Sequence, residues 1–164
     1  MTPKLRILCL GNDLLADDAF GGVVAERLRC QWPSLDVVET SVTGFDLIDY
    51  LQEASRLVVI DSVQTGTSPP GTIYSLRESD IKSLSGPSPH YIGLFETLAL
   101  ARKLQLATPE EVIILAVEVA DCTSLGGRMH PAVQGAVSAV LDLVGEIAQA
   151  STAMGSRSES ASLP

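Results

Sequence analysis

Short apolar runs alternate with helix-like segments along most of this chain, and that pattern limits the folds open to it. Four runs have the length and the flanking turn residues of buried strands. They lie at residues 4–10, 35–40, 56–63 and 111–119. Helical spacing of apolar residues predicts helices at 18–31, 44–54, 91–106 and 132–150. Strands that alternate with helices in this way form a largely parallel sheet covered by helices.

A fifth strand is predicted at residues 72–78, directly after the Gly- and Pro-containing loop "QTGTSPPG". That loop is too short for a helical crossover, so this strand is expected to be antiparallel at an edge. We therefore predict the α/β class: a three-layer α/β/α sandwich around a mostly parallel five-stranded sheet with one antiparallel strand. Residues 1–150 form one domain in this prediction, and the Ser-rich, aperiodic residues 151–164 form a flexible tail.

Charge and cysteine content limit the kinds of binding partner and the cellular compartment expected for this chain. The formal net charge is −9 and no local basic patch stands out, which disfavours nucleic-acid binding. The three cysteines are scattered, as expected for reduced thiols in a cytoplasmic protein. No apolar run approaches the ~18 residues of a membrane span, and the N-terminus lacks the cleavage region of a signal peptide. We expect a cytoplasmic protein that binds neither nucleic acid nor membrane.

Acidic residues follow two of the predicted strands. Asp17 and Asp18 come shortly after the first strand, which stops at Gly11, and Asp61 lies near the end of the third. In open α/β sheets, ligands bind beyond the carboxyl ends of the strands, where the strand order reverses. Two carboxylates from distant parts of the sequence should therefore meet in one cleft. Asp17 is assigned to the turn and helix start, and Asp18 to the cleft.

Both histidines stand at loop-to-helix junctions that can face the same rim: His90 in "SPHYIGL" and His130 in "RMHPAV". A histidine there is more often structural, and an aspartate at a helix start is more often a cap. Together, however, two carboxylates and an imidazole form an oxygen and nitrogen set that suits a divalent transition metal or activates water. No HExxH or CxxC motif signals a permanent zinc site.

Four motifs in this order resemble those of the hydrogenase maturation endopeptidases, which trim the C-terminus of the large subunit of [NiFe] hydrogenases. They are "GNDLLADDAFG", "VVIDSV", "PGTIYSL" and "SPHYIGL", within residues 5–150. The resemblance implies an α/β/α sandwich. It also implies that Asp18, Asp61 and His90 are the catalytic, metal-contacting residues of the site.

The resemblance further implies a protease that carries no permanently bound metal or cofactor. Ni²⁺ arrives already bound by the hydrogenase large-subunit precursor, and Asp18, Asp61 and His90 recognise it and so position the scissile bond. The enzyme would be of the aspartic type rather than a zinc metalloprotease, and water activated by nickel or by a carboxylate would attack. One departure is Cys9, which stands where the family usually has glycine and predicts a different cleft floor.

Two other kinds of function remain open on the residues alone. The cleft suits a non-enzymatic, metal-dependent binding or chaperone module for a metalloenzyme precursor. It also suits a small-molecule α/β enzyme that uses the carboxylate pair. His130 is either an additional polar group at the rim or a spectator.

Overall fold

Five strands form one sheet in this computed structural model, which describes the backbone of residues 4–80 and 89–159 and the side chains of residues 4–80 and 94–153. The strands are β1 (Leu5–Leu10), β2 (Asp36–Thr40), β3 (Arg56–Val63), β4 (Ile73–Arg77) and β5 (Glu111–Glu118). Their spatial order is β2-β1-β3-β5-β4. All neighbours are parallel except β4, which pairs antiparallel with β5 at the edge. The predicted sheet is confirmed, including its antiparallel edge strand.

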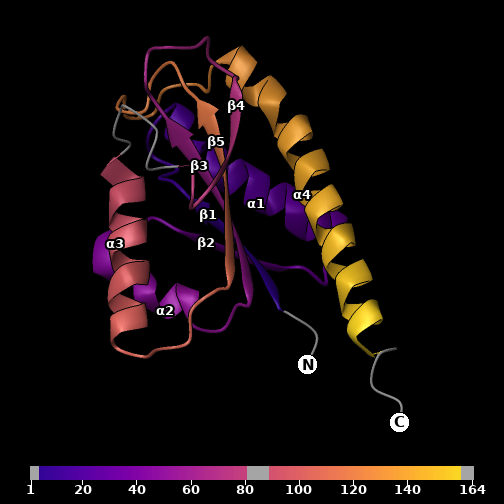
Figure 1. Ribbon diagram of the computed structural model, residues 1–164. Coiled ribbons are helices and arrows are strands. Elements are labelled where there is room, and N and C mark those ends of the chain that lie inside the picture. The colour runs from indigo at the N-terminus through magenta and orange to yellow at the C-terminus, as the bar shows by residue number, and fades with distance from the viewer. Residues whose placement is uncertain (1–3, 81–88, 160–164) are drawn as a thin grey trace.

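Helices cover both faces of the sheet, so the three-layer prediction is also confirmed (Figure 1). The helical elements are η1 (Asp17–Ala19), α1 (Phe20–Gln31), η2 (Gly44–Leu47), α2 (Ile48–Leu51), α3 (Pro89–Lys103) and α4 (Pro131–Glu159). One core cluster joins the sheet to α1 and α4, and a second joins it to η2, α2 and α3. Each face of the sheet is therefore buried under its own helical layer.

Successive side chains of each strand point to opposite faces, which separates the two cores. On β1, Ile7 and Cys9 pack with α1 and α4, whereas Leu8 and Leu10 pack on the other face. Cys9 is fully buried there and does not line the cavity described below. The expectation that it changes the cleft floor is therefore wrong. Burial raises the pKa of its thiol to about 12, so it behaves as a small apolar side chain.

The strand order reverses between β1 and β3, since β2 lies on one side of β1 and β3 on the other. Gly11 ends β1 at this point with a φ of 158°. A Cβ atom there would lie 2.3 Å from the backbone oxygen of Asp18, a distance that no side chain tolerates. Only glycine allows the chain at Asp18 to return so closely over the end of β1.

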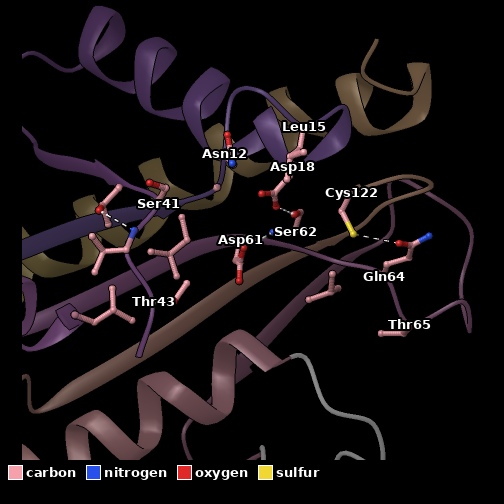
Figure 2. A pocket seen from close by; sticks show the side chains of 16 residues that line it. Asn12, Leu15, Asp18, Ser41, Thr43, Asp61, Ser62, Gln64, Thr65 and Cys122 are labelled. Carbon is pink, nitrogen blue, oxygen red and sulfur yellow. Dashed lines mark hydrogen bonds between the residues drawn. The ribbon is translucent and has the colours of Figure 1, made fainter. Parts of the chain in front are cut away.

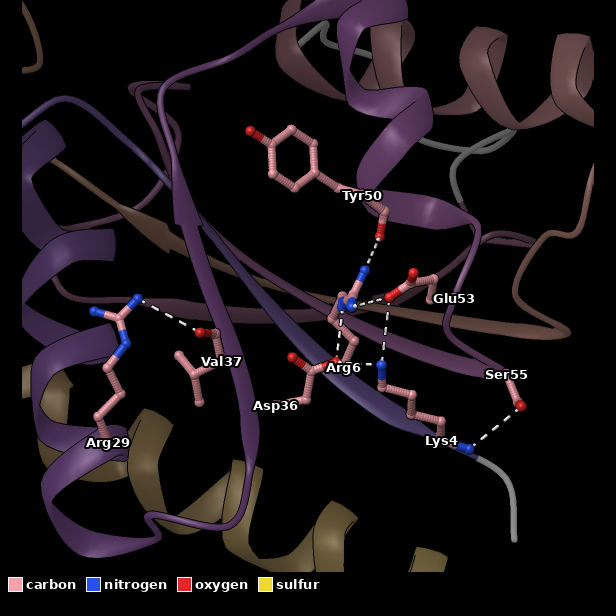
Figure 3. Close-up of polar contacts among 8 residues, drawn as sticks. All are labelled: Lys4, Arg6, Arg29, Asp36, Val37, Tyr50, Glu53 and Ser55. Atoms are coloured by element: carbon pink, nitrogen blue, oxygen red, sulfur yellow. Dashed lines mark hydrogen bonds and ion pairs between the residues drawn. The ribbon is translucent and has the colours of Figure 1, made fainter. Parts of the chain in front are cut away.

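The opposite, amino-terminal end of the sheet is closed by a charged network (Figure 3). The buried Arg6 bonds Asp36 at 2.9 Å, Glu53 at 3.3 Å and the backbone oxygen of Tyr50 at 3.0 Å. Lys4 adds longer contacts to both carboxylates. Asp36 belongs to β2, Tyr50 to α2, and Glu53 follows α2. Arg6 therefore joins the sheet to the α2 region at the end of the sheet away from the cleft.

Helix α4 differs from its prediction in length. It runs to Glu159, so the predicted tail boundary at residue 151 is wrong, and residues 160–164 lie outside the described part. Ser151 is buried and its hydroxyl accepts a hydrogen bond from Arg56 of β3. This contact ties Ser151 to β3 within a helix that the local Ser-rich sequence did not suggest.

Helix α4 is long enough and apolar enough, by length and composition alone, to resemble a membrane span. Pro131–Ala153 is long and apolar enough to cross a membrane, and it is the one such helix in the described ranges. Counting unbroken apolar runs missed this, because single polar residues interrupt the Ala, Val, Leu and Ile residues that keep the mean hydropathy high. Val133, Val137, Val140 and Val144 of this helix pack into the core against the sheet and α1.

The segment 44–54 also folds differently from its prediction. A 3₁₀ turn, Gly44–Leu47, precedes a single α-helical turn, Ile48–Leu51, in place of one continuous helix. The buried face is formed by Leu47 and Leu51. Phe45, although apolar, is exposed.

Candidate active site

A cavity of about 440 Å³ lies at the carboxyl ends of β1, β2 and β3. This is the edge of the sheet where the strand order reverses, as the α/β rule predicts. Its polar lining includes Asn12, Asp18, Thr40, Ser41, Thr43, Asp61, Ser62, Gln64, Thr65 and Cys122 (Figure 2). Asp18 and Asp61, 43 positions apart in the sequence, therefore share one cavity.

Asp61 lies near the end of β3 and is almost completely buried. One carboxylate oxygen, Oδ1, accepts the backbone N–H of Ser62 at 2.8 Å. The other, Oδ2, is buried without a hydrogen-bond partner among the described residues. Burial raises the pKa of Asp61 to about 8; the Ser62 N–H opposes this rise, and the charge of Asp18 adds to it. An orphaned carboxylate oxygen facing a cavity is a place where a cation or a proton donor gains much.

Asp18 reaches the cavity from η1 and is tied to β3 by a side chain. The Ser62 hydroxyl donates a 2.7 Å hydrogen bond to its Oδ1. Ser62 thus contacts both carboxylates, through its side chain in one case and its backbone in the other. In Figure 2 the Asp18 carboxylate points toward Ser62, whereas Asp61 points toward the face covered by α3. The alternation along β3 agrees, since Val59 and Val63 pack on that same face.

Asp17 has a structural role that differs from the predicted one. It makes no side-chain cap for its own helical turn. Its buried carboxylate instead accepts three backbone N–H groups from the chain between β5 and α4: Ala120 and Asp121 at 2.9 Å each, and His130 at 2.6 Å. Asp17 therefore fixes the loop that carries Cys122 to the cavity, while its neighbour Asp18 faces the cavity itself.

Glu118, at the end of β5, holds a second loop of the rim. Its buried carboxylate accepts the N–H and hydroxyl of Thr65, the N–H of Gly66 and the hydroxyl of Tyr74, at 2.7–3.0 Å. Burial opposes ionisation of Glu118, but these hydrogen bonds outweigh it and hold its pKa below the usual value. The loop between β3 and β4 is thereby tied to the end of β5.

A side-chain bridge joins the loop after β3 to the loop after β5. Gln64 donates to the backbone oxygen of Ala120 at 2.8 Å and accepts from the Cys122 thiol at 3.1 Å. Burial, aided by the charge of Asp18, raises the pKa of Cys122, so the thiol stays protonated and donates. This pair closes the cavity on the side of β5.

The two histidines lie at the N-terminal ends of different helices, and the structure describes the side chain of only one of them. His90 lies in the first turn of α3, on the side of the sheet toward which Asp61 points, but its side chain lies outside the described residues. His130 directly precedes α4, and its Nδ1 accepts the backbone N–H of Ala132 at 3.2 Å. His130 is therefore a cap for α4 and does not line the cavity. Among the side chains that the structure describes, no group of three or more His, Cys, Asp or Glu is placed to hold a metal ion.

Several lining residues were not singled out from the sequence. Ser62 follows Asp61 directly in "VVIDSV", and a polar residue beside a strand-end aspartate was the available signal. Cys122 and Gln64 offered no such signal, because each reaches the cavity through a loop whose path depends on Asp17 and Glu118.

Comparison with known proteins finds related sequences and a similar fold. The family model described as HycI, hydrogenase maturation protease, matches residues 23–147. The hydrogenase expression/formation protein HupD of Thiocapsa roseopersicina is 28% identical over 147 residues, which cover 86% of this chain and 66% of that protein. HupM of Azotobacter chroococcum is 30% identical, with 85% of this chain and 69% of that protein covered. Among solved structures, the hydrogenase maturating endopeptidase HybD from E. coli superposes with a TM-score of 0.72 at 23% identity, covering 86% of this chain and 89% of that one.

The fold defines an α/β/α protein built like the maturation endopeptidase from E. coli. By its sequence, the chain belongs to the hydrogenase maturation protease family, whose members are peptidases. That membership favours a peptidase over both the non-enzymatic binding module and the small-molecule enzyme considered from the residues alone.

Proposed function

We propose that this protein is a cytoplasmic endopeptidase that removes the C-terminal extension of a nickel-loaded [NiFe] hydrogenase large-subunit precursor. In this proposal the bound Ni²⁺ is part of the substrate and is recognised through Asp18, Asp61 and His90. No metal or cofactor belongs permanently to the enzyme. The observation that carries the proposal is the buried Oδ2 of Asp61, which has no partner in the described part of the chain and lies in a cavity that Asp18 shares.

The donor chemistry supports a cation as the group recognised. Two carboxylates on one cavity repel each other, and the charge of Asp18 already raises the pKa of Asp61. A cation between them relieves that repulsion and provides a partner for the unpartnered oxygen. An imidazole from the first turn of α3 would complete a set suited to Ni²⁺. Two carboxylates alone hold a free ion weakly, which suits recognition of nickel that the precursor already binds.

In this proposal, catalysis depends on positioning of the scissile peptide bond. Gripping the nickel centre brings the nearby peptide bond to a fixed place in the cavity, and such positioning is worth roughly 7–11 kcal/mol of barrier. Water activated by the nickel or by a carboxylate then attacks the peptide carbonyl. A precursor without nickel gives the carboxylates nothing to grip, so cleavage reports that metal loading is complete.

A processing assay tests the proposal. Purified nickel-loaded precursor is incubated with the protein, and the mass of the large subunit is followed; the expected result is loss of the C-terminal extension. Metal-free precursor should stay intact, and Asp61→Ala should fold normally yet lower the rate at least about 100-fold. A nickel-dependent complex without any change of mass would instead indicate a binding module, and full activity of Asp61→Ala would remove Asp61 from the site.

A further inference from the structure

Exposed apolar side chains gather around the cavity. Five large apolar side chains in the described ranges are exposed: Leu14, Phe45, Leu104, Leu106 and Leu125. Leu14 adjoins Leu15, which lines the cavity, and Phe45 lies between the lining residues Thr43 and Leu47. Leu104 and Leu106 follow α3, whose C-terminal end lies away from the cavity (Figure 1). We call Leu14, Leu125 and Phe45 the apolar rim.

Two members of the apolar rim are held on one rigid platform. Leu15 and Leu125 pair as an antiparallel bridge. The backbone oxygen of Leu14 accepts Gly126 N–H at 2.9 Å, and that of Ser124 accepts Ala16 N–H at 3.0 Å. The carboxylate of Asp17, two residues after Leu15, accepts three backbone N–H groups of the chain between β5 and α4, which also carries Leu125. The backbone thus holds Leu14 and Leu125 out in water, 67% and 78% exposed, instead of turning them inward.

Phe45 stands on the other wall. Figure 2 shows Leu15 and Thr43 on opposite sides of the two carboxylates. Phe45, two residues beyond Thr43, is 57% exposed. The backbone oxygen of Gly44 accepts the Thr97 hydroxyl at 3.0 Å, which anchors this wall to α3. Apolar contacts are therefore offered on both sides of the cavity mouth.

The charges beside the apolar rim select the kind of partner. Asp13 is exposed next to Leu14, and Asp18 lines the cavity. Asp121 is ionised, because hydrogen bonds from Ser124 and Thr123 lower its pKa to about 2. An acidic surface with apolar anchors complements a segment that carries apolar and basic side chains, and it repels an anionic lipid surface.

We propose that the apolar rim docks the segment of the precursor on either side of the scissile bond, through apolar side chains flanked by basic ones. This inference rests on the proposed function and adds a binding surface to it. The carboxylates recognise the nickel, while Leu14, Leu125 and Phe45 hold the polypeptide. Exposed large apolar side chains gathered beside a cavity are typical of protein-interaction sites.

The test compares Leu14→Ser/Leu125→Ser with Leu104→Ser. All three positions are exposed leucines, Leu104 at 58%, so the variants should fold alike, which thermal melting checks. Processing of nickel-loaded precursor is measured over a range of precursor concentrations. We expect the double variant to raise KM about tenfold or more with kcat within about twofold, and Leu104→Ser to match wild type. Phe45→Ser should raise KM in the same direction.

Each other outcome overturns the proposal in a recognisable way. If wild type cleaves the precursor and the double variant behaves like Leu104→Ser, the rim is not the docking surface, although the proposed function stands. If wild type neither binds nor shortens the precursor, both proposals fail. If the double variant abolishes a wild-type dimer seen by size-exclusion chromatography, or abolishes binding to zwitterionic or anionic vesicles, the leucines serve a second copy or a membrane instead.

Discussion

The hydroxyl of Ser62 donates a 2.7 Å hydrogen bond to the carboxylate of Asp18, and its backbone N–H bonds the carboxylate of Asp61. One residue thus orients both acidic groups of the candidate site. This arrangement distinguishes the two carboxylates, since Asp18 is paired and Asp61 retains an oxygen that has no partner among the described residues.

Removing the Ser62 hydroxyl should therefore impair processing more than folding. We expect Ser62→Ala to lower the free energy of unfolding by only about 0.5–1.5 kcal/mol, since one hydrogen bond is lost. The processing rate should fall about tenfold, because Asp18 is no longer held toward β3. Ser138→Ala, on the exposed face of α4, is the matched control. A rate for Ser62→Ala equal to that of the control would show that Asp18 needs no such support.

The buried Asp61 should make stability depend on pH. Its pKa is about 8 in the folded protein and near the ordinary 3.8 when unfolded, so the folded state retains the proton longer. The stabilisation that Asp61 gives the folded state through this proton is fully present below pH 3.8. It is lost as pH rises toward 8, and the free energy of unfolding falls by at most about 1.4 kcal/mol per pH unit. Asp61→Asn, which cannot ionise, should gain stability relative to wild type over this window.

Urea denaturation at pH 5, 6, 7 and 8 measures that difference. Asp142→Asn, on the exposed face of α4, makes the same change of net charge and serves as control. Parallel stability curves for wild type and Asp61→Asn would mean that Asp61 is ionised throughout.

Asp17 should matter for stability far more than its neighbours in the same loop. Asp17→Ala removes the acceptor of three backbone N–H groups, at Ala120, Asp121 and His130. We expect a loss of about 2–5 kcal/mol and faster hydrogen exchange at those three amides. The exposed Asp13→Ala should change stability by no more than about 0.5 kcal/mol. Unchanged exchange in Asp17→Ala would contradict the assigned role.

Two helix glycines should respond oppositely to alanine. A Cβ atom at Gly21 of α1 would lie 2.2 Å from the backbone oxygen of Leu10, so Gly21→Ala must push α1 away from β1. We expect a loss of about 1–3 kcal/mol. At Gly135 of α4 a Cβ atom meets nothing within 4 Å, and Gly135→Ala should gain about 0.5–1 kcal/mol. Thermal or urea unfolding of both variants checks the opposite signs.

Local pattern was enough to predict the order and type of the elements. The β-branched run at Arg56–Val63 has the bounds expected for it, and the short loop before Ile73–Arg77 correctly indicated an antiparallel edge. The sequence pattern did not predict two features of the folded chain. Ser151 lies within α4 and hydrogen-bonds Arg56 although the local sequence is Ser-rich, and Phe45 is exposed although it is apolar.

The sequence by itself determined the sheet, its helical layers and the strand ends at which Asp18 and Asp61 stand, because apolar periodicity and the α/β connection rules are local properties. Only the tertiary structure decided what each carboxylate does. Asp17 and Asp18 are adjacent and chemically identical, yet one is buried against backbone amides about 100 residues away and the other lines the cavity. Hydrogen-bond partners and desolvation come from distant segments, and these set the role and the pKa of a carboxylate.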